Sequence, residues 1–313
     1  MQIAFVKCHG SGNDFPLIDA RGIDLPDADW AALARAMADR AGPVGGDGLL
    51  LLRDGRDGAA FAMVMRNADG SEAETCLNGL RCVARLGFEV TGLEAATVSL
   101  KTSTARVARA EPIAPGVTTI RTEAGPASTR SGDVGLRIEA ESVIDSAIPG
   151  LPSARRFTAV AMPNPHLVTF VEAVDEAELV ALGDWCEAGP GLIPARANAS
   201  FVELRGPDLF VRTYERGVGL TDSCGSAMAA STYAAGLTGR VPFGQETRVF
   251  NKGGLVRARA EADGMVTILG NATFLYDATI EFDPETGAIG TPLIHARRED
   301  EARAWEAAKA ALG

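Results

Sequence analysis

The chain has 313 residues and a formal net charge of -11, and 46% of its residues are hydrophobic. This length and composition permit one large domain or two medium ones with a sizeable core. The acidic charge argues against binding to nucleic-acid phosphates. We find no apolar run of membrane-span length and no signal peptide at the start, so we expect a soluble, cytoplasmic protein.

The first half of the chain is predicted to alternate strands with two helices. In chain order we predict a strand from residue 3, a sharp turn at 9–14, a second strand to 19, a helix over 27–41, strands at 49–52 and 61–66, and a helix over 80–89. Glycine-rich residues 42–48 end the first helix. Short strands and turns should then alternate to about residue 138, with a domain boundary near residue 123.

The second half repeats this outline. We predict strands at 157–161 and 167–171, a helix over 175–188, strands at 200–204 and 210–214, a helix over 227–235, and closing strands between 247 and 282. Each half thus contains strands, a glycine-rich turn, a cysteine followed by small residues, and a helix. This is a weak internal similarity and not a short-period repeat. A charged, alanine-rich helix over 297–312 ends the chain.

The five cysteines do not form a disulfide framework, because an odd number is spread thinly over a long chain. Only three histidines are present and no two cysteines form a C-x-x-C pair, which disfavours a structural zinc site. Cys8, Cys82 and Cys186 have no functional context. We therefore interpret these three as structural residues.

Cys76 and Cys224 each stand just before a predicted helix start. Free N–H groups at a helix start favour a thiolate, lower the cysteine pKa and can bind a carboxylate. A thiolate and a thiol on opposite faces of an amino-acid Cα could exchange its proton and invert the centre. From these local features alone, two buried cysteines chosen for size are equally plausible. A cysteine hydrolase or transferase with His166 as the base is a further alternative.

Five motifs in one order are similar to those of the diaminopimelate epimerase family, a group of amino-acid racemases that do not use PLP. The match extends from Lys7 to about Phe282. The motifs are residues 9–15 (HGSGNDF), residues 66–82 (from RNADGSEAE to CLNGLRC), Asn164-Pro165-His166, Asn198, and residues 215–226 (from ERGVG to CGS). Together they are far more specific than any one of them.

The resemblance implies an α/β (α+β) fold of two pseudo-symmetric domains, each a mixed sheet or barrel wrapped around a central helix. Residues 1–123 with 276–313 would form the domain containing Cys76, and residues 124–275 the domain containing Cys224. The strand near Thr279 would return to the first domain. The resemblance also implies an active site in the cleft, a homodimer, a small-molecule amino-acid substrate, and neither cofactor nor metal.

The resemblance further assigns roles to single residues. Cys76 and Cys224 would be the catalytic acid and base. The substrate-binding residues would be Asn13 near the reacting end, the backbone around Leu77-Asn78 and Gly225-Ser226 at the reacting carboxylate, and Asn67, Asn164, Asn198, Glu215 and Arg216 at the far end. His166 and Glu215 would also lie near the reacting amino group. An arginine can clamp a carboxylate with two hydrogen bonds, and amides suit an ammonium and a carboxylate together.

The predicted reaction is the cofactor-independent epimerisation of LL-2,6-diaminopimelate to the meso form, a step toward lysine and peptidoglycan precursors. Four residues differ from the family pattern, and most of them lie beside the cysteines: Leu77, Pro163, Leu220 and Ala227. They bear on the choice of substrate more than on the reaction class. The alternatives are a racemase of another amino acid, such as histidine, and an isomerase relative that moves a double bond. We also predict that oxidation links the two catalytic cysteines.

Overall fold

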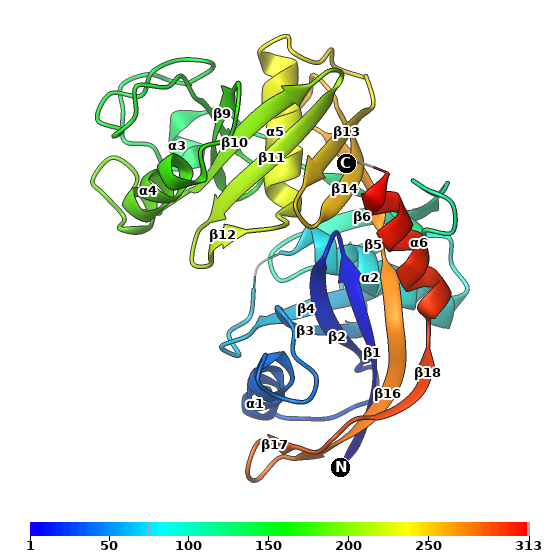
Figure 1. Cartoon of the computed structure of the whole chain (residues 1–313). Coiled ribbons are helices and arrows are strands. Elements are labelled where there is room, and N and C mark those ends of the chain that lie inside the picture. The colour runs from blue at the N-terminus through cyan, green and yellow to red at the C-terminus, as the bar shows by residue number, and fades with distance from the viewer. Residues whose placement is uncertain (74, 312–313) are drawn as a thin grey trace. The chain divides into compact units, whose positions relative to one another are not determined.

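The computed structural model describes residues 1–73 and 75–311. By their internal contacts the residues form two compact units, which we call unit 1 (Met1–Thr122 with Leu269–Gly313) and unit 2 (Glu123–Ile268). Figure 1 labels most of their helices and strands.

Unit 1 is a mixed sheet with three helices. Its strands are β1 (Gln2–Gly10), β2 (Asn13–Asp19), β3 (Gly48–Asp54), β4 (Phe61–Asn67), β5 (Ala95–Ser99), β6 (Thr104–Ala110), β16 (Thr273–Asp283), β17 (Ala288–Ile289) and β18 (Leu293–Arg297). Its helices are α1 (Asp27–Ala38), α2 (Leu77–Thr91) and α6 (Glu299–Ala310). From β1 to β6, neighbouring strands pair in the order antiparallel, parallel, antiparallel, parallel, antiparallel.

The strands of unit 2 alternate between antiparallel and parallel pairing in the same way. Its strands are β8 (Thr158–Ala161), β9 (Pro165–Val171), β10 (Asn198–Arg205), β11 (Asp208–Glu215), β12 (Gly219–Thr221), β13 (Thr247–Asn251) and β14 (Gly254–Ala260). Its helices are α3 (Ser131–Val134), α4 (Glu176–Glu187) and α5 (Gly225–Leu237), while β7 (Thr119–Ala124) and β15 (Val266–Asn271) run across the unit boundaries. The order β8–β9–β10–β11–β13–β14 repeats the pairing of β1 to β6.

The helices occupy equivalent places in the two repeats. Helix α4 joins β9 to β10 as α1 joins β2 to β3, because a parallel pair needs a crossover connection. Helices α2 and α5 follow β4 and β11 in the same way, and each packs against several strands of its own unit. Both are central: every residue of α2 from Leu77 to Phe88 and of α5 from Gly225 to Ala235 is buried. The prediction of two similar halves, each a mixed sheet around a central helix, is confirmed.

The predicted helices are all present, with ends that differ by one to three residues at most positions. The exception is the stretch from Gly125 to Ile138, where the expected strands are absent and α3 forms one short turn. Its apolar residues Val134 and Leu136 are buried in the core of unit 2, and single bridges such as Arg130–Ser142 replace a strand ladder. Glycines and a proline interrupt the alternation that a strand would need.

The chain ends in unit 1. Strand β16 pairs antiparallel with β1, with Thr279 opposite Ala4, as predicted for the strand near Thr279. Strand β18 then pairs with β16, and α6 packs on β16 (Figure 1). Among the helices that the structure describes, none is both long and apolar enough to span a membrane.

Candidate active site

Cys76 is the N-cap residue of α2, the central helix of unit 1. Its backbone is extended (φ -150°, ψ 105°), and its Sγ accepts a hydrogen bond from the Gly79 N–H at 3.3 Å. The helix begins at Leu77, three residues before the predicted start, so the cysteine stands directly at the free N–H groups. Such N–H groups can also hold a carboxylate.

The Asn13 side chain links the first turn of the chain to Cys76. Its Oδ1 lies 3.7 Å from the Cys76 Sγ and 3.5 Å from the Asn78 Nδ2. Its Nδ2 donates to the Asp47 carboxylate at 2.5 Å, and Arg40 in turn donates to Asp47 at 2.6 Å. Asp47 therefore orients the amide so that its oxygen faces the cysteine. Asp47 was not among the predicted site residues, and its signal in the sequence is a polar residue among the glycines of 42–48.

Arg81 holds the start of α2 in place through buried hydrogen bonds. Its side chain is fully buried, and it donates to the Asn78 Oδ1 at 2.9 Å, to the Ser11 hydroxyl at 3.0 Å and to the Asn271 carbonyl at 2.9 Å. Burial lowers the pKa of Arg81 to about 10, so it remains charged at neutral pH. It stands beside Cys82 in the second motif, but its contacts depend on segments far away in the sequence.

Gly10 lies in close contact with the same helix start. A Cβ at this position would lie 2.6 Å from the Asn78 carbonyl oxygen and 3.0 Å from the Arg81 Nη2. No side chain fits there without movement of the backbone. The turn at residues 9–14 and the start of α2 are therefore packed directly against each other.

Asn67 ends strand β4, opposite Gly48 of β3. Its Nδ2 donates to the Ser71 hydroxyl at 2.9 Å, and its backbone N–H donates to the Ser71 carbonyl at 2.8 Å. These two hydrogen bonds close a turn at residues 67–71. The Asn67 side chain shapes that turn, at the same end of β3 as Asp47.

Cys224 is the N-cap residue of α5, the central helix of unit 2. Its backbone is extended like that of Cys76 (φ -131°, ψ 109°), and its Sγ lies 3.5 Å from the Ser226 hydroxyl. Burial and then the Glu215 carboxylate raise the pKa of the Cys224 thiol well above its usual value, although Ser226 and a backbone N–H act in the opposite direction. The prediction of a lowered pKa is wrong for Cys224, because loss of solvation outweighs the helix N-terminus.

Glu215 ends strand β11, beside the segment that leads to Cys224. Its Oε1 accepts a hydrogen bond from the Thr221 hydroxyl at 2.5 Å. Strand β12 folds back along β11, with Gly219 opposite Glu215. A narrow recess next to Cys224 is lined by residues from β11, β12, α5 and β13, namely Val211, Thr213, Thr221, Asp222, Ser223, Met228 and Asn251.

The remaining predicted residues of unit 2 lie at one end of the neighbouring strands β9, β10 and β11. Asn198 begins β10 opposite His166 of β9, and its Oδ1 accepts from the Arg216 backbone N–H at 2.8 Å. The Arg216 guanidinium donates to the Ala195 carbonyl at 3.1 Å. Within the described part of the chain, no carboxylate pairs with this guanidinium. The guanidinium is therefore held by a backbone carbonyl, and the Arg216 backbone is held by the Asn198 amide oxygen.

His166 is completely buried, and its Nε2 lies 3.0 Å from the Asn164 Oδ1. Burial, followed by the charge of Arg216, lowers the pKa of His166 to about 3. The imidazole is therefore neutral at physiological pH and is poorly suited to act as a general base. Its evident role is to hold Asn164, since the ring nitrogen and the amide oxygen face each other.

The four departures from the family pattern fall into two groups. Leu77 and Ala227 are buried in the first turns of α2 and α5, and Leu77 has an ordinary helical backbone without a positive φ. Pro163 and Leu220 are exposed. None of the four strains the backbone beside a cysteine.

The three other cysteines are buried in the interior of their units, as predicted. Cys8 donates to the Phe15 carbonyl at 3.4 Å and contacts Cys82, and Cys186 lies in the core of unit 2. Cys76 is the one cysteine of the five that is partly exposed. Within residues 1–73 and 75–311, no group of three or more His, Cys, Asp or Glu side chains is arranged to hold a metal ion.

Solved structures share this fold at low sequence identity. A predicted epimerase from Pseudomonas aeruginosa has a TM-score of 0.64 at 17% identity, covering 88% of this chain and 98% of its own. A hydroxyproline epimerase from Agrobacterium vitis, solved with trans-4-hydroxy-L-proline, has a TM-score of 0.62 at 14% identity and covers 92% and 94%. A methylitaconate delta-isomerase has a TM-score of 0.61 at 12% identity, covering 95% and 99%. The chain therefore has a fold found among racemases, epimerases and related isomerases.

Sequence comparison identifies the family within that fold. The diaminopimelate epimerase family model matches residues 5–108 and 158–275. Proteins named diaminopimelate epimerase are 37% identical over 290 residues in Clostridium acetobutylicum (90% of this chain and 87% of theirs) and 38% identical over 282 residues in Ligilactobacillus salivarius (86% and 87%). The chain belongs to the diaminopimelate epimerase family, a family of isomerases.

Proposed function

We propose that this protein interconverts LL- and meso-2,6-diaminopimelate, with Cys76 and Cys224 as the acid and base and without PLP or metal. One observation supports this more than any other. Each of the two similar units places a cysteine, with the same extended backbone, at the N-cap of its buried central helix. Two matched cysteines suit a reaction that needs matched groups on two faces of one carbon.

In the proposed step, the thiolate of one cysteine removes the Cα proton and becomes a thiol. The thiol of the other cysteine gives its proton to the opposite face of Cα and becomes a thiolate. Charge that builds on the substrate carboxylate is stabilised by the N–H groups at the starts of α2 and α5. Because burial raises the pKa of Cys224, we assign it as the initial proton donor and Cys76 as the initial base.

The second amino-acid group of diaminopimelate is assigned to unit 2. Arg216 has a guanidinium without a carboxylate partner in the described chain, and Asn198 and Asn164 lie at the same end of strands β10 and β9. A guanidinium with neutral amides beside it fits a carboxylate next to an ammonium. Relatives named diaminopimelate epimerase, at 37 and 38% identity, support the same substrate.

The two units would be the two domains predicted from the sequence, each contributing one cysteine to the reaction. The product would serve lysine and peptidoglycan precursor synthesis in the cytoplasm. We also propose a homodimer, which light scattering of the purified protein would test.

The deciding experiment is α-proton exchange in deuterium oxide with metal-free and PLP-free protein. We expect LL-diaminopimelate to incorporate one α-deuterium and to yield the meso form. Absence of both would refute the proposed substrate. A panel of other L-amino acids, histidine included, and an unsaturated dicarboxylate run in parallel would identify a racemase of another amino acid or a double-bond isomerase, which the shared fold alone does not distinguish.

A further inference from the structure

The C-terminal helix α6 is tied to α2, the helix that begins at Cys76, through a shielded ion pair. Arg85 lies two turns along α2 from Asn78, and its guanidinium donates to both carboxylate oxygens of Glu301 in α6, with Nη2 to Oε1 at 2.8 Å. The Arg85 side chain is 6% exposed and that of Glu301 is 21% exposed. Solvent therefore screens this pair far less than an ion pair on the surface.

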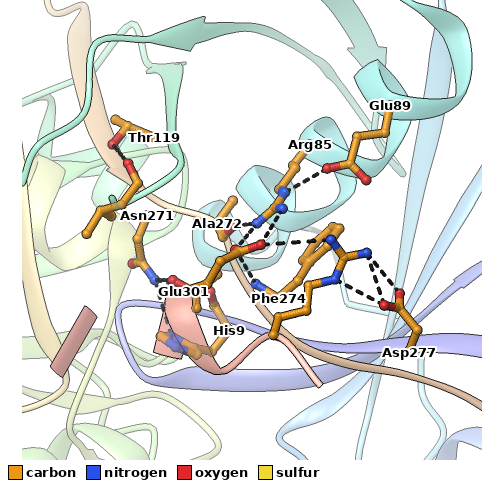
Figure 2. A network of polar contacts seen from close by, with 12 residues as sticks. His9, Arg85, Glu89, Thr119, Asn271, Ala272, Phe274, Asp277 and Glu301 are labelled. Carbon is orange, nitrogen blue, oxygen red and sulfur yellow. Dashed lines mark hydrogen bonds and ion pairs between the residues drawn. The ribbon is translucent and has the colours of Figure 1, made fainter. Parts of the chain in front are cut away.

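Arg85 and Glu301 both also contact the segment at residues 272–274 (Figure 2). Arg85 Nη1 donates to the Ala272 carbonyl at 2.7 Å, and its guanidinium lies 3.8 Å from the centroid of the Phe274 ring. The Glu301 carboxylate accepts from the Phe274 N–H at 3.3 Å. Arg298, just before α6, pairs with Asp277 of β16 at 3.0 Å, so the start of the helix is fixed as well.

These contacts continue to the proposed catalytic residues. One turn closer to Cys76, Arg81 holds the carbonyl of Asn271, the neighbour of Ala272, and also holds Asn78. The Asn271 side chain accepts from the Ser11 N–H at 2.6 Å and donates to the His9 carbonyl at 3.3 Å. Residues 271–272 thus lie between two arginines of α2 and the turn that leads to Asn13.

Helix α6 also contacts that turn directly. Trp305 is 1% exposed, and its ring centroid lies 5.7 Å from that of His9. The His9 Nδ1 accepts from the Asn271 Nδ2 at 3.2 Å and from the Gly12 N–H at 3.3 Å. Glu301 and Trp305 are four residues apart and therefore lie on one face of the helix. That face contacts α2 through Arg85 and the turn at residues 9–14 through His9.

We propose that α6 is a positioning element for Cys76, with Glu301 acting through Arg85 to hold the start of α2 against the turn that contains Asn13. The family match ends at residue 275 and so includes neither residue 301 nor any other part of α6. The proposal rests on the proposed role of Cys76 as an acid/base residue. Without the Glu301 charge, Arg85 keeps its pair with Glu89 of the same helix at 2.9 Å but loses its link to α6. The contact between Asn13 and Cys76 then loosens.

The test compares Glu301→Gln with Glu299→Gln in the full chain. Glu299 is two residues away on the same helix, its side chain is 70% exposed, and it pairs with Arg303 of α6 at 3.7 Å. Both variants remove one negative charge, but only the first touches α2. The first measurement is the rate at which iodoacetamide alkylates Cys76 at fixed pH, followed by peptide mass spectrometry with Cys224 as the internal reference.

We expect Cys76 to be alkylated about fivefold faster in Glu301→Gln, the factor that one ordinary hydrogen bond contributes. The Asn13 oxygen then no longer holds the proton on the Cys76 sulfur, so the reactive thiolate forms more readily. Cys224 should be unaffected, and Glu299→Gln should match the wild type. The kcat for α-proton exchange should fall by a similar factor with little change in KM. Glu301→Asp, which keeps the carboxylate, should restore most of both properties.

Equal Cys76 alkylation rates in Glu301→Gln and Glu299→Gln, with both proteins folded by circular dichroism, would overturn the positioning role. If Glu301→Gln does not fold, Arg85→Lys, which keeps the charge but cannot donate to both carboxylate oxygens of Glu301, is compared with Glu299→Gln by the same two measurements. Equal rates would again overturn the positioning role. The alkylation rate requires no substrate. A wild-type protein that exchanges no α-proton of diaminopimelate would therefore refute the proposed function separately.

Discussion

The Asp47 carboxylate accepts a 2.5 Å hydrogen bond from the Asn13 side-chain nitrogen, and it thereby determines which way that amide points. With the nitrogen held by Asp47, the amide oxygen faces the Cys76 sulfur at 3.7 Å. In Asp47→Asn this orientation is no longer enforced. We expect kcat for exchange to fall about tenfold, the effect of losing one charge-assisted hydrogen bond, and steady-state assays would measure it. Asp57→Asn, at an exposed turn, is the control and should behave as the wild type.

Removal of either proposed acid/base residue should nearly abolish the reaction. We expect Cys76→Ala and Cys224→Ala each to lower kcat about a thousandfold, the usual range for a lost acid or base. Cys186→Ala removes a buried cysteine from the core of unit 2 and should retain nearly full kcat. Substantial activity in either of the first two variants would contradict the two-cysteine mechanism.

Arg216→Lys should weaken binding of the far end of the substrate without affecting the proton transfer. A lysine keeps the charge but cannot make two parallel hydrogen bonds to a carboxylate. We expect KM for diaminopimelate to rise about tenfold with kcat largely unchanged. Arg205→Lys is the matched control, since Arg205 is on the same sheet, is half-exposed and pairs with Glu203. An unchanged KM in Arg216→Lys would remove Arg216 from the proposed substrate site.

Two buried histidines should make the protein less stable in mild acid. Burial lowers the pKa of His9 to about 4 and that of His166 to about 3, from a usual value of 6.5. Between pH 6.5 and about 4 the unfolded chain binds protons that the folded chain does not, so stability falls as the pH drops through this window. The slope approaches about 1.4 kcal/mol per pH unit for each histidine.

Urea unfolding at pH 7.0, 5.5 and 4.5 measures this slope. His166→Gln should flatten it by removing one of the two groups, whereas His295→Gln, at an exposed position, should leave it unchanged. A wild-type protein with the same free energy of unfolding at all three pH values would show that the histidines do not titrate as described.

Oxidation should inactivate the protein by linking Cys76 to Cys224. The prediction follows from the proposal that both sulfurs meet at one substrate carbon. Peptide mapping after mild oxidation should find this link, and a thiol reductant should restore activity. A fully active oxidised protein, or a link between two other cysteines, would argue against a shared site.

The sequence was sufficient to predict the fold, because each half repeats the same order of strands and helices and its apolar spacing is regular. The predicted starts of α2 and α5 were two to three residues too late, because a cysteine is not a usual N-cap residue. The segment at residues 125–138 was mispredicted because its apolar residues pack singly into the core of unit 2.

The site was predictable only in part. The residues named from motifs lie at helix starts and strand ends, where local sequence is informative. Asp47, Arg81 and Glu301 were missed, because each acts through a contact across 30 to more than 200 positions. The raised pKa of Cys224 was missed for a related reason, since burial is a property of the folded unit and helix position alone predicted the opposite direction.

The contact of Gly10 with the start of α2 has a consequence for engineering this enzyme fold. A methyl group at position 10 would lie 2.6 Å from the Asn78 carbonyl oxygen, so the turn and the helix leave no space for a side chain between them. A mutant library that randomises residues 9–13 would therefore consist mostly of misfolded or displaced variants. Diversity aimed at a new substrate is better placed at the exposed positions of unit 2, such as Leu220 and Pro163, where a changed side chain has room.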